Sequence, residues 1–277
     1  DRRRHGIDAD RPAALAVGLL ATVLVILPLL AIVFASLRKS AGAPLSLSSL
    51  SLVHWNAILF DPRTLRAAAR SLLLAFGAGA LVAVFGTAVA VVGRRGRVGR
   101  VLEIAAQWPY AIPGTVFAMA LIVSFSMNYR LVVLETVSLT LLLASSSWLL
   151  LVAYAAKYLA LGTRNVSESL EQLDPSLAES ARMSGATPWQ AFRDAVLPLL
   201  RPAMVGAFVV AFMLCATELT ISVLLVPPGV EVLGTLLFEL QTYADPGAAS
   251  VLACGFVVLV LSAFSLIHIL RPESAHG

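Results

Sequence analysis

The sequence predicts an all-α membrane protein with about six transmembrane helices. Apolar residues make up 59% of its 277 residues and charged residues only 13%, whereas a soluble domain carries roughly a quarter charged residues. The mean hydropathy is +0.88, and several apolar runs reach the ~20 residues that a helix needs to cross a bilayer. So few charges cannot cover a water-exposed surface of this size, and membrane lipid is the expected surrounding.

Six apolar stretches account for the predicted spans. They cover residues 13–34, 71–92, 104–125, 131–154, 203–226 and 248–270, and together they form one membrane domain of residues 13–270. The polar residues 1–12 are expected to form a cytoplasmic segment separate from the first span, and residues 271–277 a cytoplasmic tail. Asp61 followed by Pro62 is typical of a helix start, so a helix is expected to begin there and continue into the second span.

The basic residues predict the side of the membrane on which each connection lies. With the N-terminus inside, fourteen of the 20 lysine and arginine residues fall in cytoplasmic segments and the other six in outer segments. Basic residues accumulate on the cytoplasmic side of membrane proteins, so both termini and the polar residues 155–202 are expected there. These topology signals explain the net charge of +4, and nucleic acid is not an expected partner.

The residues that most often carry chemistry form no pattern of an active site or a metal site. Cys215 and Cys254 lie inside apolar runs, where they are expected to act as small buried hydrophobes. The four histidines are scattered without ligand spacing. We therefore expect no catalytic residue, metal or cofactor in this chain.

The long polar segment between the fourth and fifth spans predicts two helices joined by a tight turn. Each helix is expected to begin at an N-cap followed by proline, and the second has a capping box. A glycine is expected to end the first helix, and two prolines to break the second before the fifth span. In chain order these residues are Asp174, Pro175, Gly185, Thr187, Pro188, Gln190, Pro198 and Pro202. Such a unit suits either a rigid knob for a partner or an amphipathic hairpin on the membrane.

Within this segment, ESARMSGATPWQAFRDAVLP (residues 179–198) resembles the EAA signature of ABC importer permeases. The signature is Glu-Ala-Ala, three residues, glycine, nine residues, a hydrophobe, one residue and Leu-Pro. The matching residues are Glu179, Ala181, Gly185, Leu197 and Pro198, with Ser180 in place of the first alanine and Ala195 where a larger aliphatic is usual. The wider resemblance covers about residues 60–270.

The resemblance implies a type I ABC importer permease fold in the bacterial inner membrane, with a cytoplasmic coupling loop at about residues 165–200. In that family the loop sits in a groove of a cytoplasmic ATPase subunit, which Glu179 would contact. Two ATPase subunits that bind ATP-Mg, a second permease half and an extracytoplasmic substrate-binding protein would be the partners. The second half would be another copy, or this chain would be the C-terminal half of a fused permease. No G-x-x-x-x-G-K-[ST] phosphate loop occurs in this chain, so the ATP chemistry is expected on the partner.

Three residues are candidates for the translocation path. Glu218 falls inside the fifth predicted span, where an acidic side chain is costly and by default functional or paired. Pro113 and Gly114 interrupt the third span, and a broken helix is tolerated only where protein or water satisfies its backbone. The alternative for Glu218 is a structural hydrogen bond to a neighbouring helix, from a donor such as Gln107 or Ser147.

The solute is addressed only by a second resemblance. Residues 217–240 resemble the ferric-iron branch of these permeases, which shows Glu-Leu, a leucine run, a proline-glycine turn and Thr-Leu. Ferric iron is therefore the expected solute, with a phosphonate, thiamine or a polyamine as alternatives. A secondary transporter driven by an ion gradient is the alternative of another class, but it would show inverted repeats and several intramembrane charges. An intramembrane enzyme would need a serine–histidine pairing that the sequence does not offer.

Overall fold

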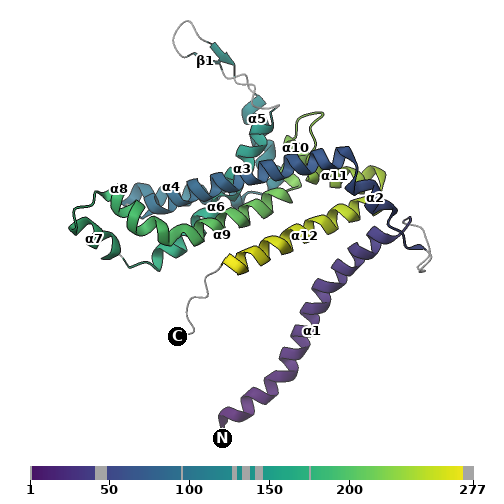
Figure 1. The fold of residues 1–277 in the computed structure, drawn as a ribbon, viewed down its shortest axis with the longest axis horizontal. Helices are drawn as coiled ribbons and strands as arrows, with labels where there is room; N and C mark the ends of the chain where they lie inside the picture. The colour runs from purple at the N-terminus through teal and green to yellow at the C-terminus, as the bar shows by residue number, and fades with distance from the viewer. Residues whose placement is uncertain are drawn as a thin grey trace. The chain divides into compact units, whose positions relative to one another are not determined.

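The chain divides into two compact units in the computed structural model, which describes residues 2–40, 49–94, 96–126, 130–132, 138–140, 146–174 and 176–270. The smaller unit comprises residues 1–61 and 239–257, and the larger unit comprises residues 62–238 and 258–277. Nearly all of the described residues are helical (Figure 1). The predicted all-α fold class is therefore confirmed.

The smaller unit is held together by polar contacts around the buried side chain of His54. Its elements are α1 (Arg2–Leu37), α2 (Val53–Leu59), the π-helical turn η3 (Leu240–Ala244) and the first half of α12 (Pro246–Leu270). The Nδ1 atom of His54 lies 2.8 Å from Asp245 Oδ2, and its Nε2 atom lies 3.0 Å from the carbonyl oxygen of Arg38. Asp245 also accepts hydrogen bonds from the backbone amides of Gly247 and Ala248. One histidine thus ties α2 to the start of the last helix.

The first helix is longer than the sequence predicts. α1 begins at Arg2, so residues 2–12 continue the helix of the first span and do not form a separate segment. Four of these eleven residues are arginine, which has high helix propensity. A helix satisfies its backbone internally in water as well as in lipid, so polar side chains need not end it.

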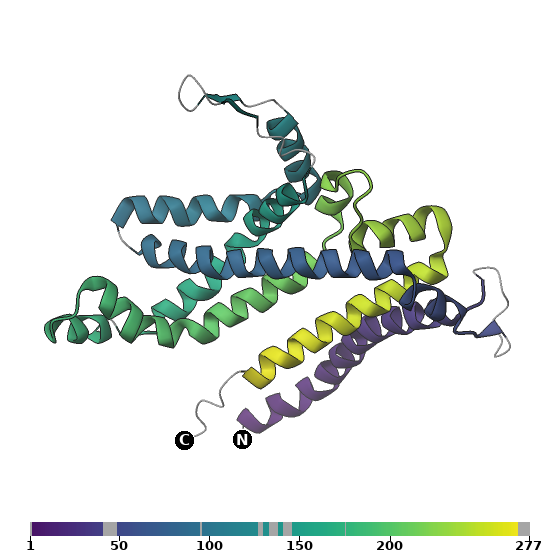
Figure 2. The same cartoon turned by 45° about the horizontal axis from the view of Figure 1, so that its top comes forward.

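The core of the larger unit is built from closely packed helices with small residues between them. The helices are α3 (Pro62–Gly93), α4 (Gly96–Ala111), α6 (Ser147–Glu171) and α9 (Leu197–Ala216), which pack side by side (Figure 2). Where α3 and α6 cross, a β-carbon on Gly162 would lie 2.5 Å from Val82 Cγ1, and one on Gly86 would lie 2.8 Å from the backbone of Gly162. Small residues allow this close approach of helices in membranes.

Shorter elements complete the larger unit. They are α5 (Gly114–Ser126), β1 (Arg130–Val132), β2 (Ser138–Thr140), α7 (Ser176–Met183), α8 (Pro188–Ala191), the π-helical turn η2 (Phe192–Val196), α10 (Thr220–Leu225) and α11 (Leu233–Glu239). The strands β1 and β2 pair antiparallel, with Leu131 opposite Leu139. The predicted helix start at Pro62 is confirmed, because α3 begins at that residue.

Four helices within the described residues are long and apolar enough to cross a membrane. They cover Ala14–Leu37, Pro62–Gly93, Pro188–Ala216 and Pro246–Leu266, and the bent pair Gly96–Ala111 and Gly114–Phe125 raises the number to as many as five. These helices overlap the first, second, third, fifth and sixth predicted spans, and the fifth, residues 203–226, is covered only as far as Ala216. The total of six stays a prediction.

Only the last part of the fourth predicted span, residues 147–154, is helical among the described residues. Its described part, before residue 146, includes β1 and β2 rather than a helix, and α6 begins only at Ser147 and continues to Glu171. The sequence places Lys157 in the polar residues 155–202 that follow this span. In the structure Lys157 is buried, so this lysine is part of the helix bundle and not of a cytoplasmic loop. Residues 133–137 and 141–145 of the predicted span lie outside the described part.

Candidate functional site

The connection between α6 and α9, residues 172–196, forms a compact helical projection that we name the α7–α8 segment. Its first helix, α7, starts beside Asp174, whose Oδ1 atom accepts a hydrogen bond from the backbone amide of Ser176 at 2.9 Å. This bond from the Ser176 backbone lowers the pKa of Asp174 below its usual value. The predicted N-cap is therefore confirmed, whereas Pro175 lies outside the described residues.

Gly185 ends α7 in a left-handed conformation. Its φ is +92°, a region that residues with a β-carbon rarely adopt. The amide of Ala186 donates to the carbonyl of Ala181 at 3.1 Å, and the amide of Gly185 donates to that of Arg182 at 3.0 Å. This pair of bonds is the Schellman arrangement that closes a helix C-terminus, and it confirms the predicted glycine stop.

The second helix of the segment begins with the predicted capping box. The Oγ1 atom of Thr187 accepts from the amide of Gln190 at 3.3 Å, and Gln190 Oε1 accepts from the amide of Thr187 at 2.8 Å. Pro188 occupies the first turn, where its missing N–H costs nothing. The two short helices are thus each positioned by residues within four positions of their own ends.

The predicted break at Pro198 and Pro202 is wrong. The helix runs on from Pro188 to Ala216, and the π-helical turn η2 precedes the first proline. The amide of Leu197 bonds to the carbonyl of Phe192 in this wider turn. Because Pro198 has no N–H and its ring crowds the carbonyl four residues earlier, the wider turn accommodates the proline without ending the helix.

The α7–α8 segment is anchored at its two ends and exposed in the middle. Leu173, Phe192 and Val196 pack against a buried cluster that includes Leu170 and Leu200. By contrast, α7 has no buried residue. The side chains of Met183, at the end of α7, and of Trp189, on α8, are 90% and 64% accessible. Among the predicted site residues of this segment, Glu179, Ser180 and Gly185 are exposed and Ala181 is half-buried.

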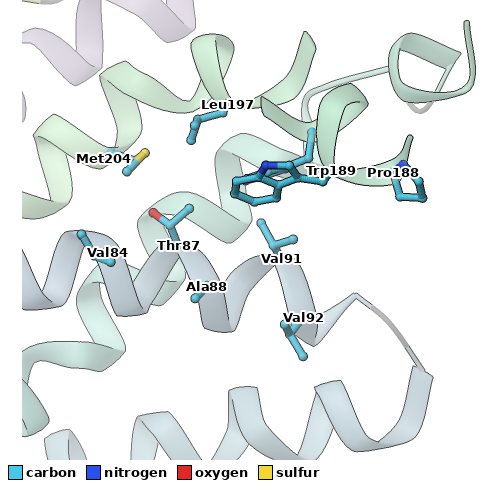
Figure 3. Close-up of a pocket in the computed structure, with 10 residues that line it drawn as sticks. Val84, Thr87, Ala88, Val91, Val92, Pro188, Trp189, Leu197 and Met204 are labelled. Carbon is cyan, nitrogen blue, oxygen red and sulfur yellow. The ribbon is translucent and has the colours of Figure 1, made fainter. Parts of the chain in front are cut away.

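An apolar cavity of about 550 Å³ lies between α3 and the end of the α7–α8 segment. Its lining residues are Val84, Thr87, Ala88, Val91 and Val92 from α3, with Pro188, Trp189, Phe192, Leu197 and Met204. Figure 3 shows the indole ring of Trp189 forming the wall beside Val91. The cavity thus lies beside Phe192, one of the residues that anchor the segment.

The third predicted span is broken at Pro113 and Gly114, as the sequence predicts. α4 ends at Ala111, α5 begins at Gly114, and the two helices meet at an angle of 107°. The carbonyls left open at the end of α4 are bonded by the ammonium group of Lys157 on α6. Lys157 Nζ donates to the carbonyl of Ile112 and lies 3.5 Å from that of Tyr110. A cation is well suited to this position because a helix C-terminus carries partial negative charge.

A second break separates α9 from α10, and Glu218 lies in it. The sequence predicts that Glu218 lies inside an unbroken span, and this prediction is wrong. In the structure Glu218 lies between α9, which ends at Ala216, and α10, which begins at Thr220. Its Oε1 atom accepts hydrogen bonds from Thr220 Oγ1 at 2.5 Å and from the amide of Ile221 at 3.2 Å. Its Oε2 atom accepts from the hydroxyl of Tyr158 on α6. These donors satisfy the carboxylate.

The two breaks touch each other. A β-carbon on Gly114 would lie 2.4 Å from Thr220 Oγ1, the same hydroxyl that donates to Glu218. The structure therefore brings the break at Pro113 and Gly114 next to the break that contains Glu218. The donor to Glu218 from a neighbouring helix is Tyr158, and the predicted donors Gln107 and Ser147 are wrong.

Tyr158 and Lys157 are the site residues that the sequence reasoning missed. Lys157 follows an apolar run, which is the usual position of a topology signal. The only local indication was its place beside two tyrosines, Tyr154 and Tyr158, at helical spacing. The described residues include no group of three or more histidine, cysteine, aspartate or glutamate side chains that could hold a metal ion.

Comparison with known proteins identifies the family. Residues 82–274 match the family described as binding-protein-dependent transport system inner membrane component. The chain belongs to this family. It is accordingly a membrane permease of an ABC importer and not a catalytic subunit, and it resides in the inner membrane as a multi-pass protein.

Three curated relatives transport different solutes. The permease is 29% identical over 243 residues to the sulfate transport system permease protein CysT of Escherichia coli K12, covering 84% of this chain and 85% of CysT. It is 28% identical over 156 residues to the 2-aminoethylphosphonate transport system permease protein PhnV of Salmonella paratyphi A, covering 55% of each. It is also 28% identical over 162 residues to the Fe(3+)-transport system permease protein FbpB 2 of Haemophilus influenzae, covering 56% of this chain and 30% of FbpB 2. The matched part is thus about half the length of PhnV and most of CysT.

Solved structures share the fold. A bacterial ABC transporter involved in the import of the acidic polysaccharide alginate superposes with a TM-score of 0.72 at 16% identity, covering 98% of this chain and 100% of that chain. The MetNI methionine ABC transporter superposes with a TM-score of 0.57 at 18% identity, covering 75% and 96%. The predicted ABC importer permease fold is therefore confirmed.

Proposed function

We propose that the α7–α8 segment is the coupling element of the permease and docks into a cytoplasmic ATPase subunit. The observation that carries the proposal is how the segment is built. α7 contributes no buried side chain to the protein's own core, yet caps at Asp174, Gly185 and Thr187 hold it in one shape. A helix that is held in one shape, but whose side chains are not buried in the protein's core, is suited to contact with a partner.

The residues of the EAA-like stretch divide into contact and positioning roles. Glu179 and Ser180 are exposed on α7 and form the contact surface, with Glu179 pairing with a basic residue of the ATPase. Ala181 is half-buried, and its carbonyl accepts the hydrogen bond from the amide of Ala186 that closes α7. Gly185 sets the turn, while Leu197 and Pro198 start the helix that carries motion into the membrane.

The complete transporter contains two ATPase subunits that bind ATP-Mg, a second permease half and an extracytoplasmic substrate-binding protein. Support comes from the family, whose name refers to binding-protein-dependent transport, and from the structural relatives, which are ABC transporters. Both termini and the α7–α8 segment lie in the cytoplasm, as the distribution of basic residues favours. Pro113, Gly114 and Glu218 border the path at the two touching helix breaks.

The proposed solute is ferric iron. Residues 217–240 support it through their resemblance to the ferric-iron branch, and the iron permease FbpB 2 is among the relatives. Sulfate and 2-aminoethylphosphonate compete with it, because CysT and PhnV are similar to the same degree. Uptake of labelled ferric iron, sulfate and 2-aminoethylphosphonate into vesicles that contain the whole transporter distinguishes the three. Uptake of sulfate alone would reject iron while leaving the coupling role intact.

The coupling role is tested by two substitutions with matched controls. Gly185→Trp places a bulky residue at φ +92°, and Gly96→Trp does the same at φ +75° at the start of α4. Neither β-carbon meets an atom within 4 Å. Glu179→Arg reverses a charge on α7, and Glu171→Arg reverses an exposed charge at the end of α6.

We expect Gly185→Trp and Glu179→Arg to lose the copurifying ATPase subunit or to uncouple ATP hydrolysis from uptake, with the melting temperature of the permease close to that of the wild type. The two control variants should keep ATPase association and uptake. Retention of coupled transport by both α7–α8 variants, or equal loss in the controls, would overturn the assignment of this segment.

A further inference from the structure

We infer that Tyr154, Lys157 and Tyr158 on α6 form a clamp that holds both helix breaks to one rigid helix, so that the two breaks move together. The inference rests on the proposed function only for what drives the motion. The clamp itself is carried by contacts within the larger unit. These residues are spaced i, i+3 and i+4 and therefore lie on one face of α6.

Each clamp residue contacts a different part of the breaks. Lys157 bonds the open carbonyls at the end of α4, and its ammonium lies 6.0 Å from the ring centroid of Phe117 on α5. It thus contacts both helices that meet at the first break. The contact to the Phe117 ring adds a weak cation–π attraction.

The second break is held twice from α6. Tyr158 donates to the Glu218 carboxylate. Tyr154 and Ser222 share a hydrogen bond of 2.5 Å, and Ser222 also donates to the carbonyl of Glu218 at 2.6 Å. Both the side chain and the backbone of Glu218 are therefore connected to α6. Buried polar networks of this kind are stable only when every member is satisfied, so the break is held in one arrangement.

The far end of α6 reaches the α7–α8 segment. Leu170 lies twelve residues after Tyr158, or about 18 Å along a helix, and packs against the cluster that anchors Phe192 and Val196. Arg94 bonds the carbonyl of Leu170 at 2.6 Å and caps this end. Figure 2 shows α6 running between the breaks and the segment. A displacement of the segment would therefore reach both breaks through one helix.

The clamp predicts distances that can be measured in the assembled transporter. Spin labels are placed on Arg164 of α6, on Val116 of α5 and on Val223 of α10, which are all exposed, with Cys215 and Cys254 replaced by alanine. Distances from position 164 to positions 116 and 223 are recorded by electron–electron double resonance, without nucleotide and with ATP-vanadate. When the clamp residues are unchanged, each pair should show a single distance. That distance should be the same without nucleotide and with ATP-vanadate.

Separate loss of each contact distinguishes the clamp from general destabilisation. Lys157→Met should add a second distance only to the 164–116 pair, and Tyr158→Phe only to the 164–223 pair, whereas Lys157→Arg keeps the donor and should behave as wild type. Tyr110→Phe removes a hydroxyl from α4 without removing the Tyr110 carbonyl and is the control. If Tyr158→Phe does not assemble, two other variants address the same second break. They are Ser222→Ala and Glu218→Gln, which retains an acceptor.

Unchanged distances in both Lys157→Met and Tyr158→Phe would overturn the clamp, as would distances that change with nucleotide in the unmodified clamp. Failure of the proposed coupling role looks different. In that case ATPase association would be insensitive to the α7–α8 variants, while the clamp variants would still alter the distances without nucleotide.

Discussion

The α7–α8 segment and the paired helix breaks are held by hydrogen bonds between residues that differ greatly in their separation along the sequence. In the segment, the capping bonds join residues two or three positions apart. Around the breaks, the side-chain bonds from α6 join residues 45 to 68 positions apart. The segment is thus rigid by local sequence and can meet a partner without its own core, whereas the breaks depend on the surrounding helices. Changes in the two regions should therefore have separable effects on folding and on coupling.

The largest expected effect on folding comes from the helix crossing next to the breaks. Gly162→Leu would place side-chain atoms where a β-carbon already lies 2.5 Å from Val82 Cγ1 and 2.8 Å from its carbonyl oxygen. Overpacking of this kind costs about 1–3 kcal/mol or more, and here the backbones themselves must separate. We expect loss of monodisperse protein in detergent by size-exclusion chromatography. Gly18→Leu, where a β-carbon meets nothing within 4 Å, should be tolerated.

The next largest effect is expected at Glu218. Glu218→Leu leaves the hydroxyl of the buried Tyr158 without its acceptor, at about 1–3 kcal/mol for an unsatisfied buried group. Glu218→Gln keeps one acceptor oxygen and should retain most of the stability, which thermal unfolding in detergent measures. If Glu218 borders the path, the Gln variant should assemble with its ATPase but import less of a cationic solute. Normal uptake by Glu218→Gln with loss of folded Glu218→Leu would assign the carboxylate a structural role alone.

A smaller and strictly local effect is expected in the α7–α8 segment. Thr187→Ala removes the capping box, which is worth about 1 kcal/mol of local helix stability. Hydrogen exchange should become faster in the peptide that covers residues 187–192 and stay unchanged in α3 and α6. Thr235→Ala, which removes a similar local cap at α11, serves as the comparison. Faster exchange throughout the larger unit would show that the segment is not independent of the core.

The smallest expected effect concerns an ion pair on the predicted outer side. The hydrogen bond from Arg63 lowers the pKa of Glu231, and the charges of Arg70 and Arg66 act in the same direction. Because the folded pKa lies below the ordinary carboxyl value of about 4.3, the stabilisation is present above that value and is lost as the pH falls through the folded pKa. For partly exposed groups it should stay under about 1 kcal/mol. Arg63→Gln should remove this part of the acid sensitivity, and an unchanged acid transition would contradict it.

The features that could be predicted from the sequence are those held by local bonds, as in the α7–α8 segment. The caps at Asp174, Gly185 and Thr187 could be predicted because their partners are a few residues away, so a short pattern contains the whole interaction. Pro113 and Gly114 likewise indicate the first break by their own backbone chemistry. The apolar lengths predict the spans, since the width of the bilayer sets the length that a helix must reach.

The errors arise where a distant partner changes the meaning of a residue. Lys157 is placed in a cytoplasmic segment because a lysine beside an apolar run is usually a topology signal. The structure buries it because the open carbonyls of Tyr110 and Ile112 accept hydrogen bonds from its ammonium group. Pro198 fails to break its helix because the η2 turn widens before it. The donors to Glu218 could not be predicted, since which helix faces residue 218 is decided by packing and not by the local sequence.

The most direct test of the account is where α7 makes its contact. A photoreactive phenylalanine derivative at Ser180, an exposed residue of α7, is activated in native membranes, and the same derivative is placed at the exposed Tyr243 on the predicted outer side. We expect Ser180 to crosslink to an ATPase subunit, and the crosslink to be lost in Gly185→Trp, with no ATPase crosslink from position 243. A crosslink to the ATPase from position 243, or from Ser180 only to lipid, would contradict the coupling role of the α7–α8 segment.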